Sequence, residues 1–175
     1  MADALHQMTI SFAPDEDRLL LRLGTAAHVE FRLWLTRRVV RQMWTALMKA
    51  VETAPAVIVQ PEKRARQAVM SMRHEAAVQS GDFTQTRDPE AKPHPLNRKP
   101  FLVTGLVCGS APDNHTNLTF KVAGGRDIQL SLDEKLVHAL CHLLVSGTTK
   151  ADWNLSLAIA EPDVVPATAE GHRLH

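Results

Sequence analysis

The sequence predicts an α+β protein built from two tandem units, each with three antiparallel strands followed by a helix. Hydrophobic residues recur at every second position before Thr36 and before Asp133, and at every third or fourth position after them. The first spacing is typical of half-buried strands and the second of amphipathic helices. The turn sequence Ala-Pro-Asp occurs at residues 13–15 and again at residues 111–113. Either an internal duplication or the shared periodicity alone explains this correspondence.

The first unit is assigned to residues 1–60 and begins with three predicted strands. Residues 8–12, 18–23 and 29–35 show the period-two alternation of strands with one buried face. Turns are expected between them, at residues 13–17 and 24–27. On the third strand the apolar residues share one face, so Arg32 and Trp34 are expected on the other face.

A helix is predicted after the third strand. Thr36 is suited to its N-cap, because a threonine hydroxyl can accept a hydrogen bond from a free amide of the first turn. Arg38 and Arg41 lie on the polar face of this helix. Its apolar face is formed at helical spacing by Val39, Val40, Met43, Trp44, Leu47 and Val51.

Residues 61–100 separate the two units. A moderately amphipathic helix is expected over residues 61–79, with Pro61 at its start. Residues 80–100 are rich in Pro, Asp, Lys and Arg and have no apolar period, so we expect a flexible linker.

The second unit is assigned to residues 101–160. Strands are expected at residues 101–108, 118–122 and 127–132, and Asp133 is expected to cap a helix that ends at Gly147. A final strand is predicted over residues 153–159, because apolar and polar residues alternate there. Residues 161–175 are expected to form a disordered tail.

Composition excludes few functions. The 45% of hydrophobic residues can form a core, and 20 basic against 19 acidic residues predict no charged partner. No secretory signal is read in residues 1–5, and no apolar run approaches the roughly 18 residues that cross a bilayer. With only Cys108 and Cys141, a disulfide framework is not expected, and free thiols in the cytoplasm are the preferred interpretation.

Basic residues are concentrated in the first unit. Residues 18–50 contain seven Arg and Lys and one Glu, a net charge of +6, whereas residues 101–150 are balanced. A Trp flanked by guanidinium groups can bind an anion through cation–π contact and phosphate pairing. In the competing explanation, Trp34 packs under the middle helix or in a subunit interface, with arginine stems around it. The candidate binding residues are Arg22, Arg32, Trp34, Arg38 and Arg41.

A second candidate is the histidine pair of the second helix. His138 and His142 are four residues apart and share one helical face, with Cys141 adjacent, so a zinc site is conceivable. His115 or His74 would have to supply a further ligand. In the alternative, His138 and His142 are surface histidines beside a core cysteine, and we expect no metal.

No catalytic motif is found in the sequence. Neither Cys108 nor Ser110 lies in a nucleophile elbow, and no catalytic order of Ser, His and Asp can be read. The sequence therefore favours a non-catalytic binding or scaffolding module that acts through a sheet face or a subunit interface. The alternatives are nucleic-acid binding through the basic face and a small metal-dependent enzyme at His138 and His142.

Expected partners follow from the same sheet. An uncovered apolar face needs a partner, so a homo-oligomer or a complex with another protein is expected. Nucleic acid is the alternative partner, and no membrane and no cofactor are expected.

The segment of residues 30–38, with the sequence EFRLWLTRR, resembles a signature of small bacterial proteins of unknown function. This resemblance covers about the first 50 residues and implies a bacterial cytosolic protein without implying an activity. The order of elements is also similar to that of PUR-type nucleic-acid-binding repeats. The second half lacks the aromatic and basic positions expected on such a sheet, so no function is transferred from that similarity.

Overall fold

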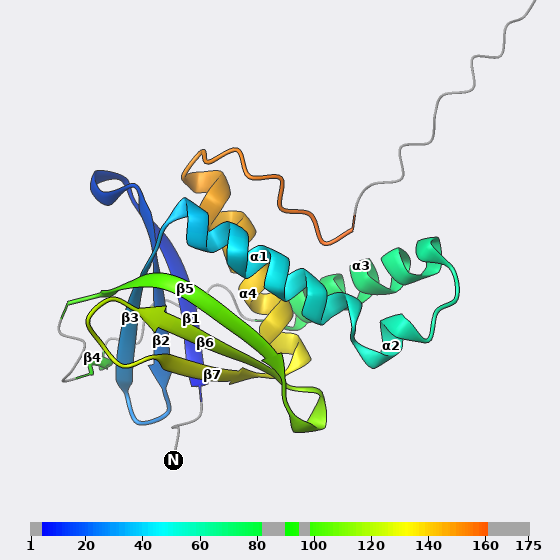
Figure 1. Cartoon of the computed structure of the whole chain (residues 1–175), viewed down its shortest axis with the longest axis horizontal. Helices are drawn as coiled ribbons and strands as arrows, with labels where there is room; N and C mark the ends of the chain where they lie inside the picture. The colour runs from blue at the N-terminus through cyan, green and yellow to red at the C-terminus, as the bar shows by residue number, and fades with distance from the viewer. Residues whose placement is uncertain (1–4, 82–89, 95–98, 161–175) are drawn as a thin grey trace, which may run out of the picture.

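The computed structural model describes residues 5–81, 90–94 and 99–160. Within these ranges the chain forms an α+β fold, as the sequence predicted (Figure 1). The first unit holds β1 (Leu5–Ala13), β2 (Arg18–Thr25), β3 (Val29–Leu35) and α1 (Arg37–Glu52). The helices α2 (Pro55–Ile58) and α3 (Lys63–Ser80) and the short strand β4 (Lys92–Pro93) follow. The second unit holds β5 (Phe101–Ser110), β6 (Thr116–Val122), β7 (Ile128–Leu132) and α4 (Glu134–Lys150).

One sheet joins the two units. Its strand order is β1-β2-β3-β5-β6-β7, with β4 beside β3, and pairing within each unit is antiparallel. The units meet where β3 pairs in parallel with β5, through Leu33 with Phe101 and Trp34 with Leu102. No helix among the described residues is both long and apolar enough to span a bilayer.

The two units have the same strand register. In the first, β1 and β2 shift register between Leu5 and Gln7, and in the second, β5 and β6 shift between Val103 and Gly105. Both hairpins are closed by a short 3₁₀ turn that begins with proline, at Pro14–Glu16 and Pro112–Asn114. These shared irregularities support the two-unit architecture, while an origin by duplication stays a prediction.

The helices cover the sheet crosswise. α1 packs against β5 of the second unit, α4 packs against β1 of the first, and the two helices also contact each other (Figure 1). The core lies between these helices and the facing side of the sheet. Its fully buried residues include Leu19, Leu21, Leu33, Leu35, Met43, Leu47, Leu118, Phe120, Leu132, Leu140 and Leu144.

Both predicted N-caps are confirmed. The hydroxyl of Thr36 accepts from the amide of Val39 at 3.4 Å, and Asp133 Oδ1 accepts from the amide of Leu136 at 2.8 Å. These bonds fix the points where strand turns into helix, since they satisfy amides that have no partner within the helix.

The predicted end of the second helix is wrong. α4 continues past Gly147 to Lys150. A Cβ at Gly147 would lie 2.8 Å from Ile10 Cγ2 and 3.1 Å from Leu19 Cδ1. The glycine therefore marks a close approach of α4 to β1 and β2, not a helix end.

The predicted final strand is also wrong. Residues 153–159 pair with no strand of the described sheet, although Leu155, Leu157 and Ile159 are partly buried against the core. Asp152 and Asn154 have positive φ angles of 51° and 50°, which break an extended course at its start. The alternation of apolar and polar residues here reflects packing of one side of the segment on the core, without a partner strand.

The middle region differs from the prediction in two respects. The chain first forms α2, and the long helix α3 begins at Lys63, two residues after Pro61. Within the expected linker, the amides of Lys92 and His94 donate to the carbonyl oxygens of His28 and Glu30, so this part is fixed beside β3. The expected tail, residues 161–175, lies outside the described residues.

Candidate functional site: a groove between α1 and β5

The predicted basic sheet face contains its own counter-ion. Arg22 and Arg32 are direct cross-strand partners on β2 and β3. The carboxylate of Glu30 is only 3% exposed, and its Oε1 lies 4.0 Å from the Nε atom of both arginines. Trp34 on the same face is half-buried and pairs across the sheet with buried Leu20. Glu30 thus gives both guanidinium groups a structural role, and their role in binding stays a prediction.

The arginines at the start of α1 also have partners within the chain. Arg37 lies over the ring of Trp153, with its Cζ 5.6 Å from the ring centroid. Arg38 Nη2 donates to the carbonyl oxygen of Thr104 at 3.3 Å. Arg41 is exposed on the same helix. The first two contacts explain why arginines occur near the positive end of a helix, where the dipole disfavours them.

Histidines of α3 and α4 contact each other. His74 of α3, one of the two further histidines that the sequence suggested, lies against His138, with an Nδ1–Nδ1 distance of 3.3 Å. The ring centroid of His142 is 6.4 Å from that of His74. Among the described residues, no group of three or more His, Cys, Asp or Glu side chains is arranged to hold a metal ion.

The histidine contact favours neutral rings. Burial lowers the pKa of His138, and the neighbouring His74 lowers it further, against the opposing effect of Glu134. Burial also lowers the pKa of His74, together with His142. In a neutral pair one Nδ1–H can donate to the other Nδ1, whereas two protonated rings would repel. The expectation that His138 is a surface side chain is wrong, because it is 2% exposed.

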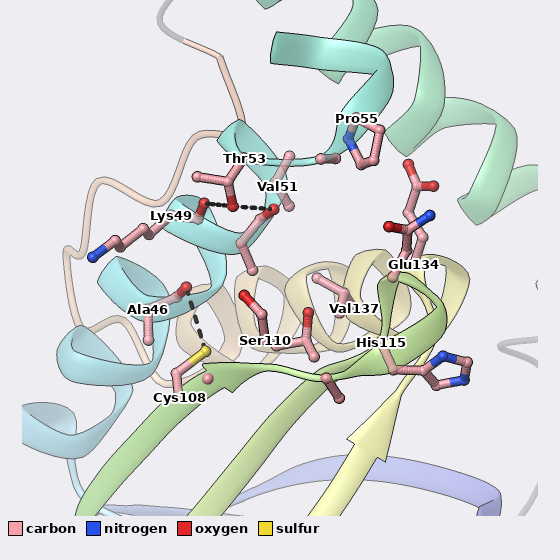
Figure 2. A pocket seen from close by; sticks show the side chains of 16 residues that line it. Ala46, Lys49, Val51, Thr53, Pro55, Cys108, Ser110, His115, Glu134 and Val137 are labelled. Atoms are coloured by element: carbon pink, nitrogen blue, oxygen red, sulfur yellow. Dashed lines mark hydrogen bonds between the residues drawn. The ribbon is translucent and has the colours of Figure 1, made fainter.

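A cavity of about 550 Å³ lies between the C-terminal half of α1, the end of β5 and the start of α4 (Figure 2). We refer to it as the groove. Its apolar wall includes Ala46, Ala50, Val51 and Val137. Polar residues surround this wall and include Thr53, Ser110, Asn114, His115, Thr116 and Glu134. A volume of this size falls within the range of roughly 300–1,000 Å³ that is usual for small-molecule sites.

The reactive side chains around the groove do not converge. The ammonium group of Lys49 and the ring of His115 both point away from the cavity (Figure 2). The carboxylate of Glu134 is held by an ion pair with Arg73 of α3, and this hydrogen bond lowers the pKa of Glu134. A nucleophile with an adjacent base, which covalent catalysis requires, is therefore not formed by these residues.

Cys108 is the thiol in the groove, and it is poorly suited to act as a nucleophile. Burial raises its pKa, although Lys49 opposes this effect. Its Sγ donates to the carbonyl oxygen of Ala46 at 3.9 Å. Since the thiolate is the reactive species, a raised pKa makes this cysteine less reactive near neutral pH.

Sequence reasoning missed the groove as a site. It considered Cys108 and Ser110 only as nucleophiles, and it did not consider Asn114 or Glu134. The groove exists because α1 crosses onto β5, and no local pattern encodes that contact. The sequence offered one signal that could have indicated the groove. This signal is the correspondence between the two halves, because it shows where equivalent positions carry different side chains.

Comparisons with protein-family models, with curated proteins and with solved structures gave no match. The resemblance of residues 30–38 to a bacterial family therefore stays a prediction.

Proposed function

We propose that this protein is a non-catalytic binding module that holds a small organic ligand in the groove between α1 and β5. The observation that carries the proposal is the cavity of about 550 Å³ with an apolar wall and a polar rim. Such a combination can bury the body of a ligand and orient it with a few hydrogen bonds. The outward-pointing Lys49 and His115 and the raised pKa of Cys108 favour binding over chemistry.

This proposal moves the working surface from the sheet face to the groove. On the sheet face, Glu30 already engages Arg22 and Arg32, and Leu20 is only 8% exposed. An anion would have to compete with a carboxylate that is already in place. The sheet face therefore offers less to nucleic acid than the +6 charge of residues 18–50 suggested.

The experiment is a fragment screen by ligand-observed NMR on the full chain and on two variants. Ser110→Phe places a ring in the groove, whereas Ser131→Phe places the same ring on the exposed residue Ser131 of β7, outside the groove lining. We expect fragments that bind the native protein and the S131F variant but not the S110F variant. If every hit binds S110F as well as the native chain, the groove is not the binding site.

Cytoplasmic location and self-association remain part of the proposal. Both cysteines are free, which suits a reducing compartment. Self-association through the sheet face would have to use Trp34, which is half-buried there. Sedimentation velocity at micromolar concentration tests it, and a single monomeric species would contradict it.

A further inference from the structure

The two units can be compared residue by residue, because their registers correspond. Phe12 pairs with Leu19 in the first unit as Ser110 pairs with Thr116 in the second. The next strands continue this correspondence, since Leu19 pairs with Leu35 as Thr116 pairs with Leu132. In the turns, Ala13 pairs with Arg18, and the amide of Ala111 donates to the carbonyl oxygen of His115.

Three equivalences follow at the ends of the two hairpins. Ser110 occupies the position of Phe12, and Asn114 occupies the position of Asp17. At the first turn of the helices, Glu134 of α4 occupies the position of Arg37 of α1. Asp17 and Asn114 each come directly before the residue that closes the turn, Arg18 and His115, and both have a positive φ, 46° and 57°.

In the first unit, an indole ring lies among these three positions. Trp153 follows α4 and is 2% exposed. Its Nε1 donates to Asp17 Oδ1 at 2.8 Å, its ring meets that of Phe12 edge-on at 6.4 Å, and Arg37 lies over its face. The segment after α4 thus closes the space between the first hairpin and the start of α1 (Figure 1).

In the second unit, the three equivalent residues line the groove. Ser110, Asn114 and Glu134 all belong to its wall. The residue equivalent to Trp153 is Ala56, which lies on α2 and not in the lining of the groove. Pro55 begins α2 soon after α1, and among the described residues that line the groove there is no Phe or Trp.

We infer that the groove accepts a free small molecule with a planar aromatic ring and an N–H donor, of the indole type. The inference rests on the proposed function and adds the chemical class of the ligand. The amide oxygen of Asn114 accepts the ring N–H, as Asp17 does from Trp153. Ser110 leaves open the space that Phe12 fills in the first unit. A free molecule is favoured over a partner's side chain, because the cavity volume is that of a small-molecule site.

Indole and benzofuran are the two probes, because they differ in the ring N–H. Binding to the full-length chain is measured by chemical-shift titration. We expect indole to bind about five to ten times more tightly than benzofuran, the value of one hydrogen bond of about 1 kcal/mol or slightly more. We expect the Ser110→Phe variant to bind neither indole nor benzofuran, and the Ser131→Phe variant to bind both as the native protein does.

The hydrogen bond is tested at Asn114. Asn114→Gly keeps the positive φ and removes the amide, and we expect it to bind indole no more tightly than benzofuran. Asp113→Gly is the matched control, because Asp113 has the same φ of 57° in the same turn but does not line the groove. Equal binding of the two probes by the native protein overturns the inference.

The remaining outcomes separate the inference from the proposed function. In one outcome, non-aromatic fragments bind the native protein, S110F abolishes their binding, and indole does not bind. The groove is then a binding site for another class of ligand, and the inference is wrong. If no compound binding depends on residue 110, both fail. If the tripeptide Gly-Trp-Gly binds more than tenfold better than indole and S110F removes it, the occupant is a peptide side chain, and the small-molecule assignment is wrong.

Discussion

Trp153 and Asp17 are 136 positions apart in the chain, and the indole Nε1–H of the first donates to the carboxylate of the second at 2.8 Å. This bond ties the segment after the last helix to the turn of the first hairpin. It is also the contact that the second unit lacks, which leaves the groove open.

Replacing Trp153 should destabilise the fold. The Trp153→Ala variant removes a ring that is 2% exposed and should lower the free energy of unfolding by about 3–5 kcal/mol. Trp153→Phe retains an aromatic ring and loses the hydrogen bond, so it should cost less, about 1–2 kcal/mol. Urea unfolding followed by circular dichroism measures both. A loss below 1 kcal/mol for W153A would mean that the ring contributes little to packing.

Gly147→Ala should destabilise the protein although alanine favours helices. The added Cβ would meet Ile10 Cγ2 at 2.8 Å and force α4 away from β1. Overpacking of this kind costs about 1–3 kcal/mol, and it opposes a helix-propensity gain of up to about 1 kcal/mol. Ser146→Ala at the neighbouring position is the control and should not lower stability. A more stable G147A variant would contradict the described approach of the two elements.

Glu30 should contribute more to the stability of the fold than an exposed carboxylate does. Glu30→Gln removes the charge of a carboxylate that is 3% exposed and lies 4.0 Å from both Arg22 and Arg32, and we expect a loss of about 1–3 kcal/mol. The control is Glu16→Gln, because Glu16 pairs with Arg18 at 3.1 Å and is 50% exposed. Exposed pairs of this type contribute less than about 1 kcal/mol. Equal effects in urea unfolding would argue against a structural role for Glu30.

Acid should weaken the contact between α3 and α4. Because the pKa of both His74 and His138 is lowered in the folded protein, the unfolded chain binds more protons at pH values below about 6.5. Stability is therefore fully present above that pH and falls as the pH drops through it. The charged or titratable neighbours of the pair are Glu134, Arg73, Glu75 and His142.

The test compares unfolding at pH 7.5 and pH 5.5. The double variant His74→Gln, His138→Gln should lose less stability between these pH values than the native protein. His115→Gln, a histidine outside this contact, is the matched control for the substitution. If the double variant shows the same loss as the native protein, the histidine pair is not the cause.

The two cysteines should react differently. Burial raises the pKa of Cys141 to about 12 and leaves it fully inaccessible, so it should not react with a thiol reagent until the protein unfolds. Cys108 is partly accessible and should react slowly, and a ligand in the groove should slow it further. Mass spectrometry after labelling at pH 8 should show one modified thiol in the native protein and two in urea. The Cys108→Ser variant should show none before unfolding.

The sequence was sufficient for the elements that local physics determines. The change of hydrophobic period at Thr36 and Asp133 predicted where strands end and helices begin, because capping and amphipathicity act over a few residues. Residues 153–159 were misassigned, because alternation reports burial on one side and cannot show whether a strand lies alongside. Gly147 was misassigned for a related reason. Glycine is typical both of a helix end and of a close approach between elements, and here it allows α4 to approach β1.

The candidate site could not be predicted in the same way. It depends on the crossing of α1 onto β5 and on the absence of a ring at the position of Ala56, and both are properties of the assembled chain. Similarly, the burial of Glu30 between Arg22 and Arg32 could not be inferred from charge counts. The sequence does not show which basic residues lie beside Glu30, because that depends on the register in which β2 and β3 pair.

The crosswise covering of the sheet has a consequence for how the chain can be divided. α1 lies over a strand of the second unit and α4 over a strand of the first. If residues 1–60 and 101–160 were made as separate polypeptides, each would retain a helix and lose the surface on which that helix rests. We therefore expect that neither unit folds alone and that the two units unfold together in one cooperative transition.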